Sequence, residues 1–160
     1  MARFLSTSTE QTIELGRILA GLLEPDDVVS LSGGLGAGKT QLSKGVALGL
    51  GIDEDVTSPT FPILVEYAGG RLPLFHFDLY RLASEAELDD VDYFGVLESG
   101  GASLVEWGDK FAAALPDDYL ELDIQTRDDG ARVVTATGHG ARGHALEHAF
   151  SSAAAAFAAG

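Results

Sequence analysis

The stretch SLSGGLGAGKTQL, at residues 30–42, constrains this chain more than any other part of it. Within it, residues 33–40 match the pattern G-x-x-x-x-G-K-[ST] without a gap. Glycines let the backbone turn so that its N–H groups point inward, and no Cβ atom blocks an incoming anion. The stretch therefore predicts a loop that cradles phosphate groups and leads directly into a helix.

Each residue type in this loop has an expected task. The helix that begins near Lys39 should present free N–H groups and its positive end to a phosphate. We expect the Lys39 ammonium to reach the β- and γ-phosphates of a nucleotide, and the Thr40 hydroxyl to bind Mg²⁺. The predicted nucleotide-binding residues of the stretch are Gly33, Gly34, Leu35, Gly36, Ala37, Gly38, Lys39, Thr40 and Gln41.

The residues around the loop predict the elements that hold it. A short, apolar strand is expected at 28–32, and a helix at 39–50. Apolar residues at helical spacing predict another helix over 9–23. The start of that helix offers two capping-box patterns, one over residues 7–10 and one over 8–11.

Two pairs of apolar segments predict β-hairpins, because each pair flanks a short turn that contains glycine. The pairs are 61–67 with 72–77 and 119–125 with 131–137. Hairpins require antiparallel neighbours, so the sheet should be mixed. We predict the α/β fold of a single-domain P-loop NTPase, with a mainly parallel sheet flanked by helices. The predicted domain spans residues 1–140, and residues 141–160 form an alanine-rich tail that is either helical or disordered.

Two acidic residues end apolar strands downstream of the loop. Asp78 closes FHFD and Glu106 closes SLVE. Because strand ends meet at the carboxyl edge of such a sheet, both carboxylates are expected beside the loop. With Lys39 they form the predicted catalytic set, and either acid can bind Mg²⁺ or place the attacking water. The sequence does not assign these two tasks between them.

Thr60 lies in the segment TSPT, at residues 57–60, which follows the helix of the loop. In folds of this class, such a connection often senses the γ-phosphate. We therefore include Thr60 among the candidate nucleotide-binding residues, with a simple turn around Pro59 as the alternative.

The charge balance argues against direct binding of DNA or RNA. The formal net charge is −15, from 25 acidic and 10 basic residues, and nucleic-acid affinity comes largely from Lys and Arg. Cysteine is absent, and no apolar run approaches the roughly 20 residues that span a bilayer. No signal-peptide pattern is visible at the amino terminus. We expect a cytoplasmic protein that contacts neither membrane nor DNA.

Residues 144–148 read His-Ala-Leu-Glu-His and match H-x-x-E-H, a pattern of zinc hydrolases. A zinc site needs further ligands, and no acidic residue follows Glu147 in the chain. The favoured interpretation is an exposed helix that carries two histidines.

Taken together, these motifs give the sequence a resemblance to the TsaE family of bacterial P-loop ATPases, over roughly residues 5–137. The motifs that carry it are TIELG at 12–16, GLGAGKT at 34–40, SPTF at 58–61, HFDLYRL at 76–82, EL at 87–88 and VEW at 105–107. The combination of HFDLYRL, SPTF and a Glu-Trp pair is far more specific than a phosphate loop alone.

The resemblance implies a set of site residues. The nucleotide would be ATP, with Thr40 on Mg²⁺ and Glu106 as the Mg²⁺-associated acid. Asp78 would be essential for hydrolysis, and Trp107 would lie beside the site. Thr9, at the start of the first helix, and Arg132, in the second hairpin, would border the adenine and ribose.

The resemblance also implies a partner-dependent function. TsaE-type proteins support the threonylcarbamoyl modification of adenosine 37 in tRNA. They act on a complex of the proteins TsaB and TsaD, and ATP binding and hydrolysis are thought to reset that complex between rounds. The tRNA would be contacted only through these partners, which agrees with the acidic charge of the chain.

Two other functions stay open on the sequence alone. A small-metabolite or nucleotide kinase would use the same loop, and it would need a pocket for a phosphate acceptor. A nucleotide-binding regulator would change its conformation when ATP binds and would not hydrolyse it.

Overall fold

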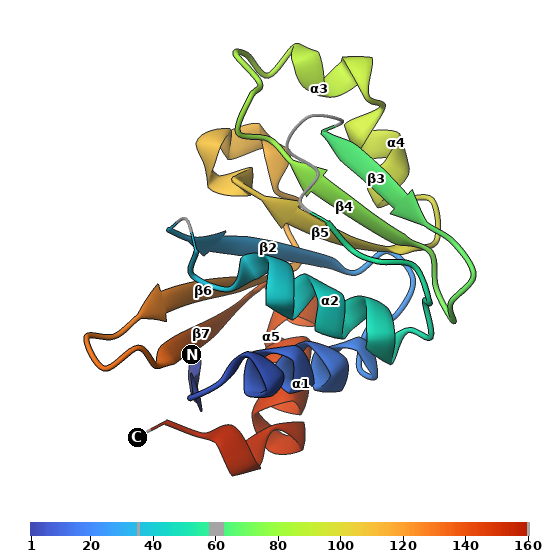
Figure 1. The fold of residues 1–160 in the computed structure, drawn as a ribbon. Coiled ribbons are helices and arrows are strands. Elements are labelled where there is room, and N and C mark those ends of the chain that lie inside the picture. Colours follow the sequence, from blue (N-terminus) through green and yellow to red (C-terminus); the bar gives the residue numbers. More distant parts are fainter. Residues whose placement is uncertain (35, 58–62, 160) are drawn as a thin grey trace.

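The described part of the chain, residues 1–34, 36–57 and 63–159 of a computed structural model, forms a seven-stranded mixed sheet with helices on both faces (Figure 1). The strands are β1 (Ala2–Ser6), β2 (Val28–Gly33), β3 (Leu64–Tyr67), β4 (Leu74–Asp78), β5 (Ala102–Glu106), β6 (Tyr119–Thr126) and β7 (Arg132–His139). The α-helices are α1 (Thr9–Ala20), α2 (Lys39–Gly49), α3 (Glu87–Asp90), α4 (Tyr93–Leu97) and α5 (Gly140–Ala153). Short 3₁₀ turns occupy Gly108–Lys110, Ala112–Ala114 and Ala155–Phe157.

Parallel strands form the centre of the sheet, and the hairpins lie toward its edges. The strand order is β1-β7-β6-β2-β5-β4-β3. Strands β6, β2, β5 and β4 run parallel, whereas β3 pairs antiparallel with β4, and β7 with β6 and β1. The predicted mixed α/β fold and both hairpins are confirmed. In the first hairpin β3 begins at Leu64, and the predicted positions 61–62 lie outside the described residues.

Two hydrophobic cores hold the sheet from its two faces. On one face, α1, α2 and α5 pack on the strands and bury side chains such as Leu31, Leu42 and Phe150. On the other face, α3 and α4 cover β4 and β5 and bury Phe77 and Tyr93. Each fully buried side chain of this size contributes about 1.5–3 kcal/mol. The ends of the central strands are therefore fixed from both sides.

Helices α1 and α2 approach each other at two glycines, and Figure 1 shows them side by side on one face of the sheet. A Cβ atom on Gly16 would lie 2.2 Å from Leu42 O, and one on Gly45 would lie 2.0 Å from Ile13 O. Any larger residue at either position would push the helices apart. This close packing places Thr9, the first residue of α1, near the start of α2.

Helix α1 begins at one of the two predicted caps and ends earlier than predicted. Ser8 Oγ accepts a hydrogen bond from Gln11 N at 3.1 Å, which confirms the pattern over residues 8–11. The helix stops at Ala20 rather than at residue 23. Leu22 and Leu23 instead form tighter turns, in which each N–H donates to the carbonyl three residues back.

Strand β1 is absent from the elements that the sequence predicts. It pairs antiparallel with β7, from Ala2 to Ser6, and the rings of Phe4 and Phe150 have centroids 4.5 Å apart. Its stability comes from partners far along the chain rather than from a local pattern. The tail, which the sequence leaves open between helix and disorder, forms α5 and packs on β7 and β6. None of the helices in the described ranges is long and apolar enough to cross a membrane.

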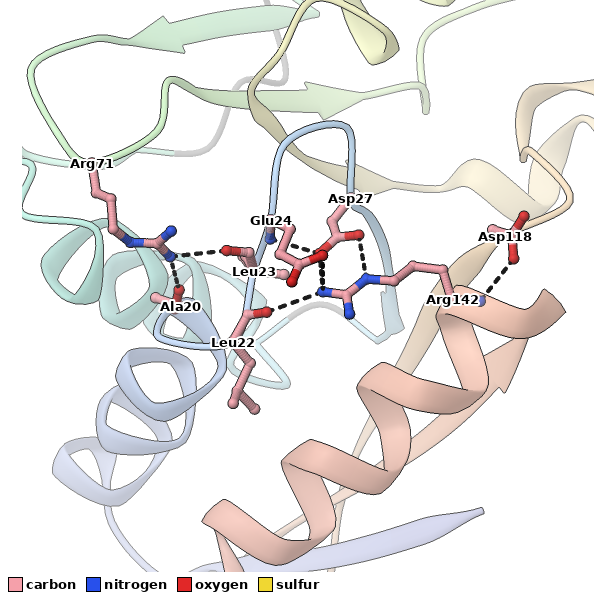
Figure 2. A network of polar contacts seen from close by, with 8 residues as sticks. All are labelled: Ala20, Leu22, Leu23, Glu24, Asp27, Arg71, Asp118 and Arg142. Carbon is pink, nitrogen blue, oxygen red and sulfur yellow. Dashed lines mark hydrogen bonds and ion pairs between the residues drawn. The ribbon is translucent and has the colours of Figure 1, made fainter.

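Figure 2 shows how α5 is tied to the loop between α1 and β2. Arg142 Nε and Nη2 donate to the two carboxylate oxygens of Asp27 at 2.9 and 2.7 Å, and Nη2 also donates to Leu22 O at 3.1 Å. The hydrogen bond to Asp27 raises the pKa of Arg142. On the other side of the same loop, Arg71 Nη2 donates to Ala20 O at the end of α1 and to Leu23 O in the loop.

We expect Arg142→Ala to lower the free energy of unfolding by about 2–3 kcal/mol, because Asp27 would stay buried without its cation. Asp27 is 6% exposed, whereas the Arg142 side chain is 34% exposed, so the loss should fall short of that for a fully buried pair. Urea unfolding, monitored by circular dichroism, measures this change in the free energy of unfolding. Arg127→Ala, which breaks an exposed pair with Asp129, is the matched control and should cost less than about 1 kcal/mol. Equal losses of unfolding free energy in both variants would contradict the stabilising role of the Arg142–Asp27 pair.

Candidate nucleotide-binding site

The predicted phosphate loop connects β2 to α2 at the carboxyl edge of the central strands. Strand β2 ends at Gly33, one residue beyond the predicted strand, and α2 begins at Lys39, as predicted. Gly38 caps the helix with a φ of 112°, a conformation that strains any residue with a side chain. The first N–H groups of a helix have no partner within it, so α2 offers donors and a positive end to an anion. Leu35, also predicted here, lies outside the described residues.

Lys39 is held between the loop and an acidic side chain. Its ammonium donates to Gly33 O at 3.0 Å and lies 3.8 Å from Glu106 Oε1. It also stands 4.9 Å from the centroid of the Trp107 ring. Lys39 is 9% exposed, so its charge acts in surroundings that water screens poorly. The structure thus brings Lys39 together with Glu106 and Trp107, a neighbouring pair that lies far from it in the sequence.

The two predicted carboxylates end neighbouring strands. Asp78 and Glu106 are directly opposite each other in the parallel pairing of β4 with β5, and each is 4% exposed. Asp78 Oδ1 accepts a hydrogen bond from Tyr80 N at 3.0 Å. Glu106 Oε2 lies 2.7 Å from His76 Nε2. Both acids therefore meet at one edge of the sheet, as expected, and Glu106 lies beside Lys39 at the start of α2.

A polar cavity of about 200 Å³ lies on one side of the loop. The residues that line it come from the β1–α1 connection, from α2 and from the β6–β7 hairpin. They are Ser6, Thr7, Ser8, Thr9, Thr12, Gly38, Gln41, Gly130 and Arg132. The structure therefore gathers Thr9, Gln41 and Arg132, three of the predicted nucleotide-binding residues, around one space next to Gly38.

Arg132 lines this cavity and also makes a contact that the sequence does not predict. Its guanidinium donates to Ala37 O at 2.8 Å, to Gly36 O at 3.0 Å and to Gly130 O at 2.8 Å. Two of these carbonyls belong to the phosphate loop, so Arg132 braces the loop from the first residue of β7. Sequence reasoning finds the residue but not this contact, because the contact joins segments about a hundred positions apart.

We expect Arg132→Ala to weaken ATP binding about 10-fold, because the loop loses donors that fix its backbone. Calorimetric titration with a non-hydrolysable ATP analogue measures the dissociation constant. Arg127→Ala serves as control, since Arg127 is an exposed arginine of the same hairpin that pairs with Asp129. An unchanged dissociation constant in Arg132→Ala would mean that the loop keeps its shape without this side chain.

A second cavity, of about 320 Å³, lies on the other side of the loop. It is lined by Leu31, Ser32, Gly33, Gly34, Lys39, Trp107, Asp109, Asp123 and Gln125. Sequence reasoning does not find Ser32, Asp109, Asp123 or Gln125. The alternation of polar and apolar residues along β6 predicts that Asp123 faces outward, but not that β2 is its neighbour. Asp123 Oδ1 accepts hydrogen bonds from Ser32 Oγ and Gln125 Nε2, both at 3.1 Å.

The residues at this edge suit Mg²⁺ and a nucleotide. Mg²⁺ prefers oxygen ligands, and two oxygen-bearing side chains are close to Lys39: Thr40 follows it in α2, and the Glu106 carboxylate lies 3.8 Å from its ammonium. Asp78, opposite Glu106 on the next strand, offers a third. A Cβ atom built on Gly34 or Gly36 would meet no atom within 4 Å, so the outer face of the loop is open to a ligand. Thr60, also predicted here, lies outside the described residues.

The H-x-x-E-H pattern does not assemble a metal site in the described part of the chain. His144 and His148 are exposed on α5, while Glu147 is engaged elsewhere. Glu147 Oε1 accepts from Gly138 N at 2.8 Å, and Oε2 lies 3.1 Å from the terminal amine of Met1. Burial raises the pKa of Glu147, but these two donors more than offset that effect and lower it overall. Within residues 1–34, 36–57 and 63–159, no group of three or more His, Asp or Glu side chains is placed to hold a metal ion.

The fold and the loop together define the class of the protein. It has the fold of a P-loop NTPase, and a solved structure shares it: the crystal structure of Bacillus subtilis YdiB aligns with a TM-score of 0.80 and 35% identity, over 94% of this chain and 93% of the other.

The particular family follows from the sequence comparisons. The family described as "Threonylcarbamoyl adenosine biosynthesis protein TsaE" matches residues 6–134, and the chain belongs to this family. The relative named tRNA threonylcarbamoyladenosine biosynthesis protein TsaE in Treponema pallidum is 42% identical over 133 residues, which is 83% of this chain and 98% of the relative. The relative of the same name in Streptomyces coelicolor is 45% identical over 136 residues, 81% of this chain and 91% of the relative.

Proposed function

We propose that this chain is the ATP-binding and ATP-hydrolysing subunit of the bacterial machinery that makes threonylcarbamoyladenosine at position 37 of tRNA. It acts on a TsaB–TsaD complex in the cytoplasm and supports repeated transfer cycles, and the tRNA is held by the partners. Membership of the TsaE family supports this proposal, because the named relatives are proteins of threonylcarbamoyladenosine biosynthesis.

One observation carries the proposal at the level of chemistry. The Lys39 ammonium lies between the phosphate loop and the carboxylate of Glu106, and Asp78 is opposite Glu106 on the next strand. A loop for phosphates, a buried cation and a pair of acids at one sheet edge are the parts that phosphoryl transfer to water requires.

Each part has a task in the proposed reaction. The loop N–H groups and Lys39 bind the phosphates and compensate the charge that develops on them. The polar cavity beside Thr9 and Arg132 receives the nucleoside. Asp78 orients the attacking water and accepts its proton. Thr40 and Glu106 would hold Mg²⁺, which would neutralise part of the phosphate charge when bound.

Lys39 explains how nucleotide state can become a conformational signal. Its ammonium bonds to the loop carbonyl of Gly33, and a γ-phosphate is the stronger acceptor for a cation. Nucleotide binding therefore draws Lys39 off this carbonyl and changes its position against Glu106 and Trp107. A partner that contacts this edge can detect the change.

The second candidate function is a kinase, favoured by the cavity beside Lys39 that Asp109 and Asp123 line. Such a space suits a hydroxylated phosphate acceptor, whose hydroxyl groups would donate to the two carboxylates.

The fate of the γ-phosphate separates the two functions. ATP labelled at the γ position is incubated with the chain, with and without TsaB–TsaD, and with a pool of small hydroxylated metabolites and nucleosides. The proposed function predicts that the label appears as inorganic phosphate, and faster when TsaB–TsaD is present. Label in a small acceptor, at a rate independent of the partners, would instead establish the kinase.

A further inference from the structure

His76 of β4 lies next to Glu106 and has no assigned task in the proposed phosphate chemistry. It is 0% exposed, and its Nε2 atom is 2.7 Å from Glu106 Oε2. An ionised carboxylate only accepts hydrogen bonds, so the imidazole donates from Nε2. The other carboxylate oxygen, Oε1, lies 3.8 Å from the Lys39 ammonium. The two oxygens of Glu106 therefore have different neighbours, the imidazole on one side and the cation of the phosphate loop on the other.

The sheet itself fixes this contact. His76 is paired with Leu104 in the parallel register of β4 with β5, and Glu106 is two residues further along the same face. Both strands lie inside the sheet, with β3 beyond β4 and β2 beyond β5. The imidazole and the carboxylate are thus anchored on a rigid part of the molecule and not on a loop.

The surroundings of the other ring nitrogen indicate why a histidine, and not an apolar residue, occupies this buried position. His76 Nδ1 is buried and has no hydrogen-bond partner among the described residues. Burying a ring nitrogen without a hydrogen bond costs free energy, and an apolar side chain at this position would avoid that cost. The hydrogen bond to Glu106 explains the polar ring, because an apolar residue could not donate it.

From this geometry we propose that His76 is a positioning residue, which holds Glu106 Oε2 so that Oε1 faces Lys39 and the place of the Mg²⁺–nucleotide complex. The inference rests on the proposed function and deepens it. Groups that orient a metal-associated side chain in this way affect metal binding by about 10- to 100-fold when removed. Without His76, Glu106 is free to rotate, and its carboxylate no longer faces the place of the Mg²⁺–nucleotide complex.

Two variants test the assignment. His76→Leu removes the donor and keeps an apolar side chain in the core. His76→Gln keeps an amide N–H the same number of bonds from the backbone as Nε2. The readout is the factor by which Mg²⁺ strengthens binding of a non-hydrolysable ATP analogue, measured by calorimetry with Mg²⁺ and with EDTA. Fluorescence of Trp107, the single tryptophan of the chain, gives a second signal from the site.

We expect His76→Leu to reduce this Mg²⁺ factor by about 10-fold or more, with analogue affinity in EDTA changed by less than about 3-fold. His76→Gln should retain most of the factor. In a Glu106→Gln background, adding His76→Leu should change the Mg²⁺ factor little, because the carboxylate that His76 positions is already absent. A residue that only fills the core would lower thermal stability and leave the Mg²⁺ factor unchanged.

The proposal is overturned if His76→Leu keeps the wild-type Mg²⁺ factor, or if folded His76→Gln loses as much as His76→Leu. A wild-type chain that binds no analogue at all would refute the proposed function instead. In that case the crystal structure of His76→Leu still decides the positioning role, since Glu106 should leave its present orientation. An unmoved Glu106 would contradict it.

Discussion

Replacing Lys39 with alanine should weaken ATP binding by about 10- to 100-fold, because a charged hydrogen bond to phosphate contributes about 1.5–3 kcal/mol. Lys39 begins α2, and its ammonium is in contact with the loop carbonyl of Gly33. It also stands near Glu106, so its removal leaves a buried carboxylate closer to the incoming phosphates. Both effects act in the same direction, and calorimetric titration with ATP measures their sum.

Lys44→Ala is the matched control for this variant. Lys44 carries the same charge on the same helix, but it lies beside Leu48 and Asp53, away from the loop. Its loss should change ATP affinity by less than about 3-fold. Equal affinities for wild-type protein and Lys39→Ala would show that the nucleotide binds elsewhere, and the identification of the site would be wrong.

Asp78→Asn should retain ATP binding and lose at least about 100-fold in hydrolysis, since a positioned carboxylate that accepts a proton contributes about 10²–10⁴-fold. Asparagine keeps an oxygen for the hydrogen bond from Tyr80 N, so the local backbone should be preserved. The side chain loses its charge and its ability to take a proton from water. Single-turnover release of labelled phosphate in the presence of TsaB–TsaD measures the chemical step.

The control for Asp78→Asn is Asp89→Asn, which removes an exposed carboxylate on α3. It should hydrolyse ATP at the wild-type rate. Wild-type hydrolysis by Asp78→Asn would transfer the role of base to another group, and Glu106, the acid opposite Asp78, would be tested next.

The sequence predicts those parts of the fold in which local pattern and tertiary structure agree. The strand–loop–helix around Lys39 and the hairpin turn that contains Gly130 follow from residue types at fixed spacing. Strand β1 does not, because it is short and is stabilised by β7 and by Phe150, which lie more than a hundred positions away. Residue pattern gives no information about such a partner.

The same limit applies to the site. That Asp78 and Glu106 end apolar strands is visible in the sequence, and the general behaviour of parallel sheets brings them to one edge. The bond from His76 to Glu106 depends on β4 being the direct neighbour of β5, in one particular register. The brace from Arg132 to the loop depends on β7 beginning beside the phosphate loop. Both contacts are set by strand order, which local sequence does not encode.

The most direct test of the proposed function is multiple-turnover threonylcarbamoyl transfer to tRNA by purified TsaB and TsaD, with the activated threonylcarbamoyl donor supplied. The reaction is run with this chain and ATP, with Lys39→Ala and ATP, and without the chain. We predict repeated cycles only with the intact chain and ATP, and a single round or less in the other two reactions. Equal turnover in all three would contradict the proposal that nucleotide use by this chain drives the cycle.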